Sequence, residues 1–262
     1  MANTVYDNVV LGNKINTILD TKLALQNLFT VDTSMTETAG MTKQVNVYTP
    51  SGDVEDLEIG KGNTKEIEVS FAPKKYDVLT TQGKFQYFDE QAMNDPTAIE
   101  AGLNGLAEEM VNNFTAKAIA ALGTATLTFD ASAGLTFDNI VDAIAAMDRE
   151  DDNDLQLLIN VADKAKLRKA LGDDLKYVED FVRTGYIGSV AGVPVYVSKA
   201  VPKNTAYLFT KDAVTLFIKK DTEIEQERDA DKRNNVVYAR RYTVVALTDA
   251  TKAVKITTGA GA

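Results

Sequence analysis

The side chains of this sequence that could do chemistry are carboxylates and lysines. The 262-residue chain contains no cysteine and no histidine. It therefore has no disulfide, no thiol nucleophile and no imidazole that titrates near neutral pH. Most hydrolase triads and most zinc sites are excluded, whereas paired carboxylates, a lysine Schiff base and a magnesium site are compatible with the composition.

The densest acidic segment could bind a hard cation. Its carboxylates belong to Asp148, Glu150, Asp151, Asp152 and Asp154. Their spacing lacks the central glycine and the terminal glutamate of a calcium loop. We therefore interpret the segment as a solvated acidic loop.

Two glycine–lysine segments resemble phosphate-binding loops only superficially. The segment from Gly60 to Lys65 lacks the GxxxxGK[ST] spacing, and no strand–turn–helix pattern surrounds it. After Gly83 and Lys84 comes Phe85, where a phosphate loop needs a hydroxyl side chain. Both segments are interpreted as turns. We predict no catalytic residue, no cofactor and no metal ion.

A mixed-charge block at residues 223–233 alternates charged with uncharged side chains. Ile224 and Gln226 separate successive acids, and this period of two is typical of a strand with one exposed face. Paired carboxylates could act as acid and base, but the pattern better suits charges that meet water or another subunit. The candidate contact residues in this block are Glu225, Glu227 and Arg228.

Two arginines interrupt the apolar strand that follows. Arg240 and Arg241 are adjacent, so they point to opposite faces of the strand. We expect at least one of them to be paired, because an unpaired buried charge is costly. Tyr238 and Tyr242 share a face with Arg240, which permits stacking of the guanidinium on a ring. Both arginines are also candidate contact residues.

Charge and hydropathy limit the partners of the chain. The net charge is -10, and no basic patch is visible, so we expect no sequence-specific binding of nucleic acid and attribute the acidity to solubility. The N-terminus has no basic stretch followed by an apolar run, and no apolar run reaches the roughly 18 residues that span a bilayer. We expect a protein of a reducing cytoplasm without membrane contact.

The elements that must position these side chains form an α+β pattern. Residues 14–29 are predicted to be an amphipathic helix, and residues 41–90 are predicted to be strands. A long helix is predicted over 95–122, with Asp95 as its N-cap. Shorter helices are predicted from Thr136 and over 162–171, separated by a buried strand at 155–159. The chain should end in strands at 193–198, 206–209, 214–219, 222–228, 235–247 and 252–258.

Residues 41–80 combine two strand patterns with a polar, turn-rich centre. Ile67, Val69 and Phe71 alternate with polar residues, which predicts a half-buried strand. Two arms of about 20 residues would reach on the order of 65 Å, whereas a compact body of this length has a radius of gyration of about 18 Å. The few apolar residues favour a projecting hairpin whose other face a neighbour covers.

Four pieces of the C-terminal half follow one another in a fixed order. They are the Gly-Val-Pro-Val element from Gly192 to Val195, the strand from Tyr207 to Phe209, the strand from Glu223 to Arg228, and the strand that carries Tyr238, Arg240, Arg241 and Tyr242. Together with the excursion and the long helix, this order resembles that of tailed-phage major capsid proteins with the Hong Kong 97 fold. The resemblance covers roughly residues 38–258.

The resemblance implies a particular organisation of the chain. It implies an α+β capsid fold with an N-terminal arm at 1–40 and an extended loop at 41–80. A peripheral domain at 81–134 would hold a spine helix at 96–122. An axial domain would follow at 135–234, and strands at 235–262 would return to the peripheral domain.

The resemblance also implies a function without catalysis, namely self-assembly into the icosahedral head shell that encloses double-stranded DNA. The expected partners are hexamers and pentamers of the same chain, a separate scaffolding protein, a portal and possible cement proteins. Assembly is expected in the host bacterial cytoplasm, and the product is the virion. In this family the extended loop lies across the adjacent subunit, so its charged residues become candidate contacts: Asp53, Glu55, Asp56, Glu58, Lys61 and Lys65.

Two other classes of function are also compatible with the sequence. The first is an encapsulin-type bacterial compartment, which has the same fold but holds a cargo enzyme. The second is a carboxylate-dependent α+β enzyme. Microscopy of the purified protein separates shells from monomers, and nucleic-acid content of particles from an infected host separates a virus from a compartment.

Overall fold

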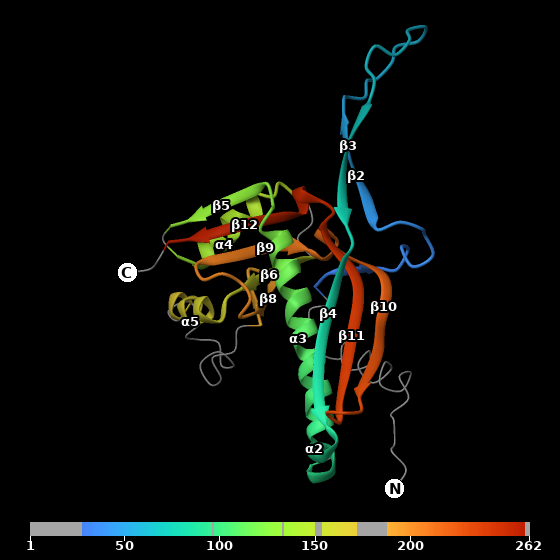
Figure 1. The fold of residues 1–262 in the computed structure, drawn as a ribbon. Coiled ribbons are helices and arrows are strands. Elements are labelled where there is room, and N and C mark those ends of the chain that lie inside the picture. The colour runs from blue at the N-terminus through green and yellow to red at the C-terminus, as the bar shows by residue number, and fades with distance from the viewer. Residues whose placement is uncertain (1–27, 96, 133, 150–153, 172–187, 260–262) are drawn as a thin grey trace.

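The computed structural model describes residues 28–95, 97–132, 134–149, 154–171 and 188–259. A long hairpin projects from a body made of two sheets and one long helix (Figure 1). The helix predicted at 14–29 lies outside the described residues. Within the described ranges, no helix is both long and apolar enough to cross a bilayer.

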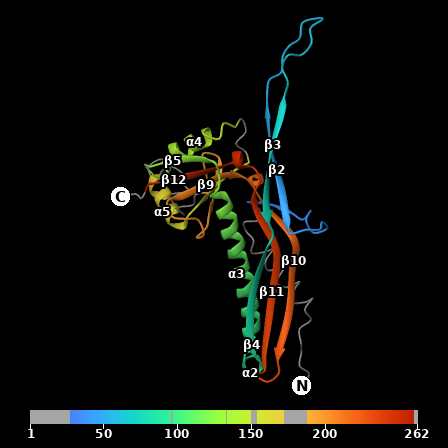
Figure 2. The ribbon, with the colours of Figure 1, turned by 45° about the horizontal axis from the view of Figure 1, so that its top comes forward.

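The projecting hairpin is formed by β2 (Thr42–Ser51) and β3 (Glu68–Asp77). The strands are antiparallel, and their pairs run from Thr42–Asp77 at the base to Ser51–Glu68 near the tip. The turned view in Figure 2 shows the same projection, which confirms that the excursion extends away from the body. We call residues 42–77 the hairpin arm.

The four-stranded sheet lies at the base of the arm. Its order is β1-β10-β11-β4, with bounds Thr30–Asp32, Val214–Asp229, Asn234–Leu247 and Leu79–Phe88. The sequence predicted separate strands at 214–219 and 222–228, which was wrong, because β10 is continuous and absorbs register shifts between Ile218 and Glu223. Such irregularities let a strand bend while its pairing continues on either side.

The long helix α3 (Thr97–Leu122) covers one face of this sheet. It is preceded by the short helix α2 (Asp89–Asn94). The predicted N-cap is confirmed, because the Asp95 carboxylate accepts hydrogen bonds from the Thr97 amide at 3.0 Å and from its hydroxyl at 2.6 Å. The apolar face of α3 packs on the sheet through Leu103, Leu106, Ala107, Met110 and Phe114, which form one core cluster with Ile224, Val237 and Ala239.

Two glycines of α3 differ in the space around them, which gives a matched test of this packing. A Cβ at Gly102 would lie 2.2 Å from the ring of Phe85, whereas a Cβ at Gly105 would meet nothing within 4 Å. Gly105→Ala should stabilise the protein by about 0.5–1 kcal/mol through helix propensity. Gly102→Ala should be at least about 1 kcal/mol less stable than Gly105→Ala, because the ring must move. Urea unfolding of the two variants measures this difference, and equal stabilities would contradict the packing described.

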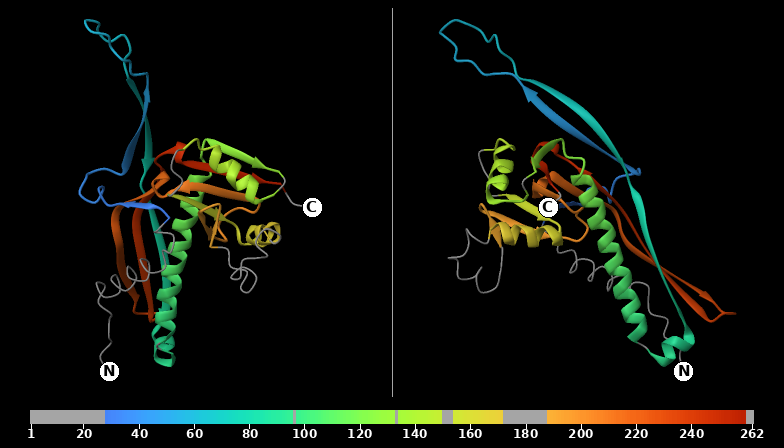
Figure 3. Two further views of the ribbon diagram at one scale, coloured as in Figure 1. Left: turned by 180° about the vertical axis from the view of Figure 1, so that it is seen from behind. Right: turned by 90° about the vertical axis from the view of Figure 1, so that its left-hand side faces the viewer.

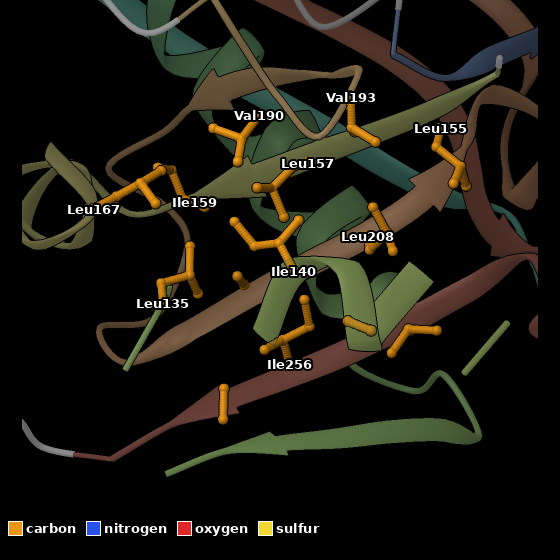
Figure 4. Close-up of a cluster of buried hydrophobic side chains, with 14 of the residues drawn as sticks. Leu135, Ile140, Leu155, Leu157, Ile159, Leu167, Val190, Val193, Leu208 and Ile256 are labelled. Atoms are coloured by element: carbon orange, nitrogen blue, oxygen red, sulfur yellow. The ribbon is translucent and has the colours of Figure 1, made fainter. Parts of the chain in front are cut away.

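The second sheet has six strands in the order β5-β12-β9-β6-β8-β7. The strands are Leu127–Ala131, Ala253–Thr258, Thr205–Thr210, Leu155–Ile159, Val193–Val197 and Ser189–Val190. Helices α4 (Phe137–Ala145) and α5 (Val161–Ala170) enclose a core with the sheet, in which Ile140 and Leu167 are buried among strand residues (Figure 4). The predicted cap of α4 is confirmed, since the Thr136 hydroxyl accepts from the Asn139 amide at 3.3 Å.

A separate cluster joins the six-stranded sheet to the end of α3. It includes Leu122 of α3, Leu158 of β6, Phe209 of β9 and Val214 of β10. The rings of Phe209 and Phe29 stack with their centroids 5.6 Å apart. The short helices η2 (Lys211–Ala213) and η3 (Ala250–Lys252) lie beside this junction. The two sheets are therefore held together by buried apolar contacts.

Three strands belong to a different sheet than the segments predicted from the sequence would suggest. Strand β10 falls within the predicted segment 135–234 but lies in the four-stranded sheet. Strands β5 and β12 come from the predicted segments 81–134 and 235–262, yet both lie in the six-stranded sheet. These memberships depend on pairings such as that between β5 and β12, which join residues about 127 positions apart.

Candidate interaction surfaces

The tip of the hairpin arm is ordered by one carboxylate. Glu55 accepts hydrogen bonds from the Thr64 amide, from the Thr64 hydroxyl at 2.8 Å and from the Lys65 amide at 3.0 Å. Because Glu55 and these partners are nine and ten residues apart, the bonds close the tip across its two sides. The tip is thus preorganised before it meets any partner.

The other predicted contact residues of the tip are charged and mostly paired with one another. Lys65 lies 3.3 Å from Asp53, and Lys61 lies 2.7 Å from Glu58. Asp56 is exposed. These exposed pairs contribute little to stability in water, so they remain able to exchange partners when a second molecule approaches.

We expect the tip to loosen in acid. Hydrogen bonds from the Thr64 amide and hydroxyl, and then from the Lys65 amide, lower the pKa of Glu55 below its ordinary value. A lowered pKa in the folded state means that this stabilisation is complete above the ordinary glutamate pKa of roughly 4.3 and is lost as the pH falls through the lowered value. The proton chemical shift of the Thr64 amide should therefore titrate with a midpoint below that ordinary value. In Glu55→Gln this titration should be absent, and a shift that is independent of pH in the native protein would contradict the assignment.

The arm also exposes apolar side chains. Ile67, Val69 and Phe71 are 57–64% exposed, so the half-buried strand face predicted from the sequence is uncovered in the single chain. The reason is that the arm has two strands, and among the described residues no second layer packs on it (Figure 3). Val54, Leu57 and Ile59 at the tip are exposed as well. Contiguous exposed apolar residues of this kind are typical of surfaces that another protein covers.

The base of the arm is fixed to the body. Val45 and Tyr76 pack against the buried side chains of Phe217 and Val244. The Tyr76 hydroxyl donates a hydrogen bond to the carbonyl of Leu247 at 3.1 Å, and burial raises the pKa of this tyrosine. The arm is therefore anchored at one end and free of the body at its tip.

The predicted charged face of β10 and β11 is present, and its residues pair within the chain. The Arg240 guanidinium donates to the Glu225 carboxylate at 2.6 Å and lies over the Tyr238 ring, 5.9 Å from its centroid. The Tyr238 hydroxyl donates to Glu227 at 3.4 Å. Arg228 lies on the opposite face of β10 by strand alternation and donates to Asp89 at the start of α2 at 2.9 Å. Hydrogen bonds from Arg228 and then from Asn235 lower the pKa of Asp89.

Arg241 occupies the opposite face, as the strand alternation predicted. Its side chain is buried, and it lies 3.4 Å from the carboxylate of Asp221 and 5.8 Å from the ring of Phe114. Arg241 is thus a structural cation between the sheet and α3, which makes it unsuited to contact another molecule. Asp221 was missed from the sequence, because only the shift in register across Lys220 and Glu223 brings it beside this arginine.

Two further features of the described residues that could suggest chemistry belong to the packing of α3. Lys117 of α3 donates to the Thr81 hydroxyl at 2.7 Å, and burial lowers its pKa, but both groups lie in the helix–sheet packing. Within the described ranges, no group of three or more acidic residues could hold a metal ion. A hollow of about 270 Å³ beside α2 is lined mainly by apolar and amide side chains, and the carboxylate among them, Asp95, caps α3.

Two comparisons with known proteins match most of the chain. A family model described as phage capsid protein matches residues 72–256. The major capsid protein of Staphylococcus phage phiMR11 is 26% identical over 260 residues, covering 96% of this chain and 93% of that protein.

Solved structures share the fold. The capsid of the native GTA particle superposes with a TM-score of 0.72 at 13% identity, covering 90% of each chain. The capsid of cyanophage P-SCSP1u gives a TM-score of 0.67 at 16% identity, covering 91% of this chain and 88% of that one. At these identities the match establishes the fold, which is an α+β capsid fold.

Proposed function

The chain belongs to the phage capsid protein family, and from this membership we propose that it is the major capsid protein of a tailed bacteriophage. Its role is structural: many copies assemble into the icosahedral shell that encloses the phage DNA. The protein is therefore a component of the virion. The family match, over most of the chain, is the observation that carries this conclusion.

The finer assignment is that of the Hong Kong 97 fold. In this proposal the hairpin arm is the extended loop, and the four-stranded sheet with α3 as its spine is the peripheral domain. The six-stranded sheet with α4 and α5 is the axial domain. The arrangement of one anchored arm and two sheets around a long helix supports this assignment (Figure 1).

The arm is the element proposed to reach an adjacent subunit. Its apolar residues Val69 and Phe71 are exposed in the single chain, and its tip is preorganised by Glu55. A neighbouring subunit would bury these side chains and give new partners to Asp53, Asp56, Glu58, Lys61 and Lys65. The candidate contact residues on β10 and β11, by contrast, already have partners within the chain and would contribute less to a contact. They are Glu225, Glu227, Arg228 and Arg240.

We further propose that the shell works by packing, without turnover, cofactor or metal ion. A separate scaffolding protein, a portal and cement proteins are the proposed partners, and assembly is proposed to occur in the host bacterial cytoplasm. The absence of histidine and cysteine from the sequence supports a structural role, because it removes the commonest nucleophiles, bases and metal ligands.

The test is assembly of the full chain, expressed alone and together with the neighbouring head genes. Size-exclusion chromatography with light scattering and negative-stain microscopy should show closed shells, or hexamers and pentamers that precede them. A species that is strictly monomeric under every condition would contradict the proposal. Particles recovered from an infected host should contain phage DNA, whereas a cargo protein in place of DNA would indicate a compartment shell.

A further inference from the structure

The two helices that pack on the six-stranded sheet lie toward different edges of the sheet and carry opposite charge. The strand order places β5 at one edge and β8 with β7 at the other. Helices α4 and α5 pack on the same face of this sheet, with α4 toward the β5 edge and α5 displaced away from it, as Figures 1 and 3 agree. We call these two regions the α4 side and the α5 side.

The α4 side is acidic. Between Gly123 and Asp148 the sequence has four aspartates and no basic residue. Asp138 and Asp142 are one helical turn apart on the exposed face of α4, and Asp130 is exposed on the edge strand β5. Within the described ranges, none of these three carboxylates forms an ion pair.

Helix α5 is basic. Helix α5 carries Lys164, Lys166, Arg168 and Lys169 against one acid, Asp163. That acid is only 3% exposed, and its carboxylate accepts from the Asn204 amide at 2.9 Å and lies 3.5 Å from Lys166. Arg168 and Lys169 are exposed in the last turn of the helix. The charge that α5 presents to its surroundings is therefore positive.

Exposed apolar residues occur on the same two helices. Phe137 and Val141 are 44% and 40% exposed and lie one turn apart on α4, next to Asp138 and Asp142. Val161 at the start of α5 is 47% exposed. Among the described residues of the six-stranded sheet and its helices, these are the only exposed large apolar side chains. Helix α4 thus combines two exposed apolar side chains with negative charge, and α5 combines one exposed valine with positive charge. Apolar residues rimmed by charge are the composition of a protein interface.

In a ring of identical copies, each contact joins two different surfaces of the chain, because the contacts are head to tail. Opposite charges on two different surfaces of one copy become complementary when copies are placed side by side in such a ring. We propose that the α5 side of one copy packs against the α4 side of the next copy around each ring of the shell. Val161 then packs near Phe137 and Val141, while Arg168 and Lys169 face the aspartates of the α4 side. This inference rests on the proposed shell function and names the surfaces through which neighbouring copies recognise each other.

Charge exchange tests the pairing, because every copy carries both sides. Arg168→Glu with Lys169→Glu places like charges in the contact and should lower the yield of particles at least about tenfold. Asp138→Lys with Asp142→Lys should do the same. The quadruple variant has opposite charges again, with the signs exchanged, and should return to within about twofold of the native yield.

A mismatched quadruple variant is the control for net charge. It combines Arg168→Glu and Lys169→Glu with Glu37→Lys and Asp231→Lys. Glu37 and Asp231 are exposed and lie in turns outside the six-stranded sheet, and neither is a candidate contact residue. Its net charge equals that of the native chain, but the contact keeps its like charges, so its particle yield should stay low. Thermal unfolding of each variant is measured in parallel, since Asp138 in the first turn of α4 and Arg168 in the last turn of α5 favour their helices through the helix dipole. The matched quadruple variant carries both of these helix penalties, so recovery of its particles cannot arise from regained stability.

The outcomes are distinct. Rescue by the matched pair and not by the mismatched pair supports the contact. Native yields in both double variants, or equal yields of the two quadruple variants, overturn it while leaving the shell function intact. If the native chain forms no shells with its head genes, the shell function itself fails.

Discussion

Deletion of residues 50–64, bridged by a short turn, is expected to leave a folded subunit that no longer assembles. The deleted segment contributes no residue to any of the four buried clusters of the described structure. Its apolar side chains, Val54, Leu57 and Ile59, are all exposed. Their loss should change the intrinsic stability by no more than about 0.5 kcal/mol, as for other exposed surface changes.

Assembly should respond very differently to the same deletion. If the arm lies across a neighbour, each copy in a shell loses its tip contacts, so a small free energy per contact is lost at every position. Thermal unfolding and particle yield measured on the same preparation should show a native transition and almost no particles. Normal shells would mean that the tip has no part in assembly, and an unfolded subunit would mean that it supports the fold.

A variant whose tip has the native length separates the effect of the length of the arm from the effect of its side-chain contacts. Residues 53–64 replaced by twelve glycine and serine residues keep the span of the tip but remove Glu55, Lys61 and the apolar side chains. If side-chain contacts drive assembly, this variant should fail as the deletion does. Recovery of shells would show that only the length of the arm matters.

Phe209→Ala is expected to cause the largest loss of stability. Phe209 is fully buried in the cluster that joins both sheets to the end of α3, and its ring stacks on Phe29 at 5.6 Å. Truncation removes the transfer free energy of the ring and leaves a cavity, which together cost about 3–5 kcal/mol. Urea unfolding monitored by circular dichroism should show this loss as a lower midpoint.

Phe71→Ala is the matched control for this substitution. It removes the same ring, but from a side chain that is 64% exposed on the arm. Its effect on the stability of the isolated subunit should be within about 0.5 kcal/mol, while the particle yield should fall. Equal destabilisation by the two substitutions would contradict the assignment of Phe209 to the core and of Phe71 to an intersubunit surface.

The sequence determined the elements whose signals are local. Helix α3 follows from apolar residues at helical spacing and from the Asp95 cap, and the hairpin arm follows from alternating residues around a turn-rich centre. These patterns depend on neighbours within a few residues, so tertiary contacts only had to agree with them. The absence of cysteine and histidine likewise fixed which chemistry was excluded, and the order of strands carried the resemblance to capsid proteins.

Only the tertiary structure decided which elements share a sheet and which charges meet. Strand β5 joins β12, and Arg241 meets Asp221 across a register shift, through contacts that no local pattern encodes. The separation of the acidic α4 side from the basic α5 side likewise became visible only when the strand order was known. The physical reason is that a strand's alternation specifies which face is buried but leaves open which strand it pairs with. That choice is made by the packing of the whole chain.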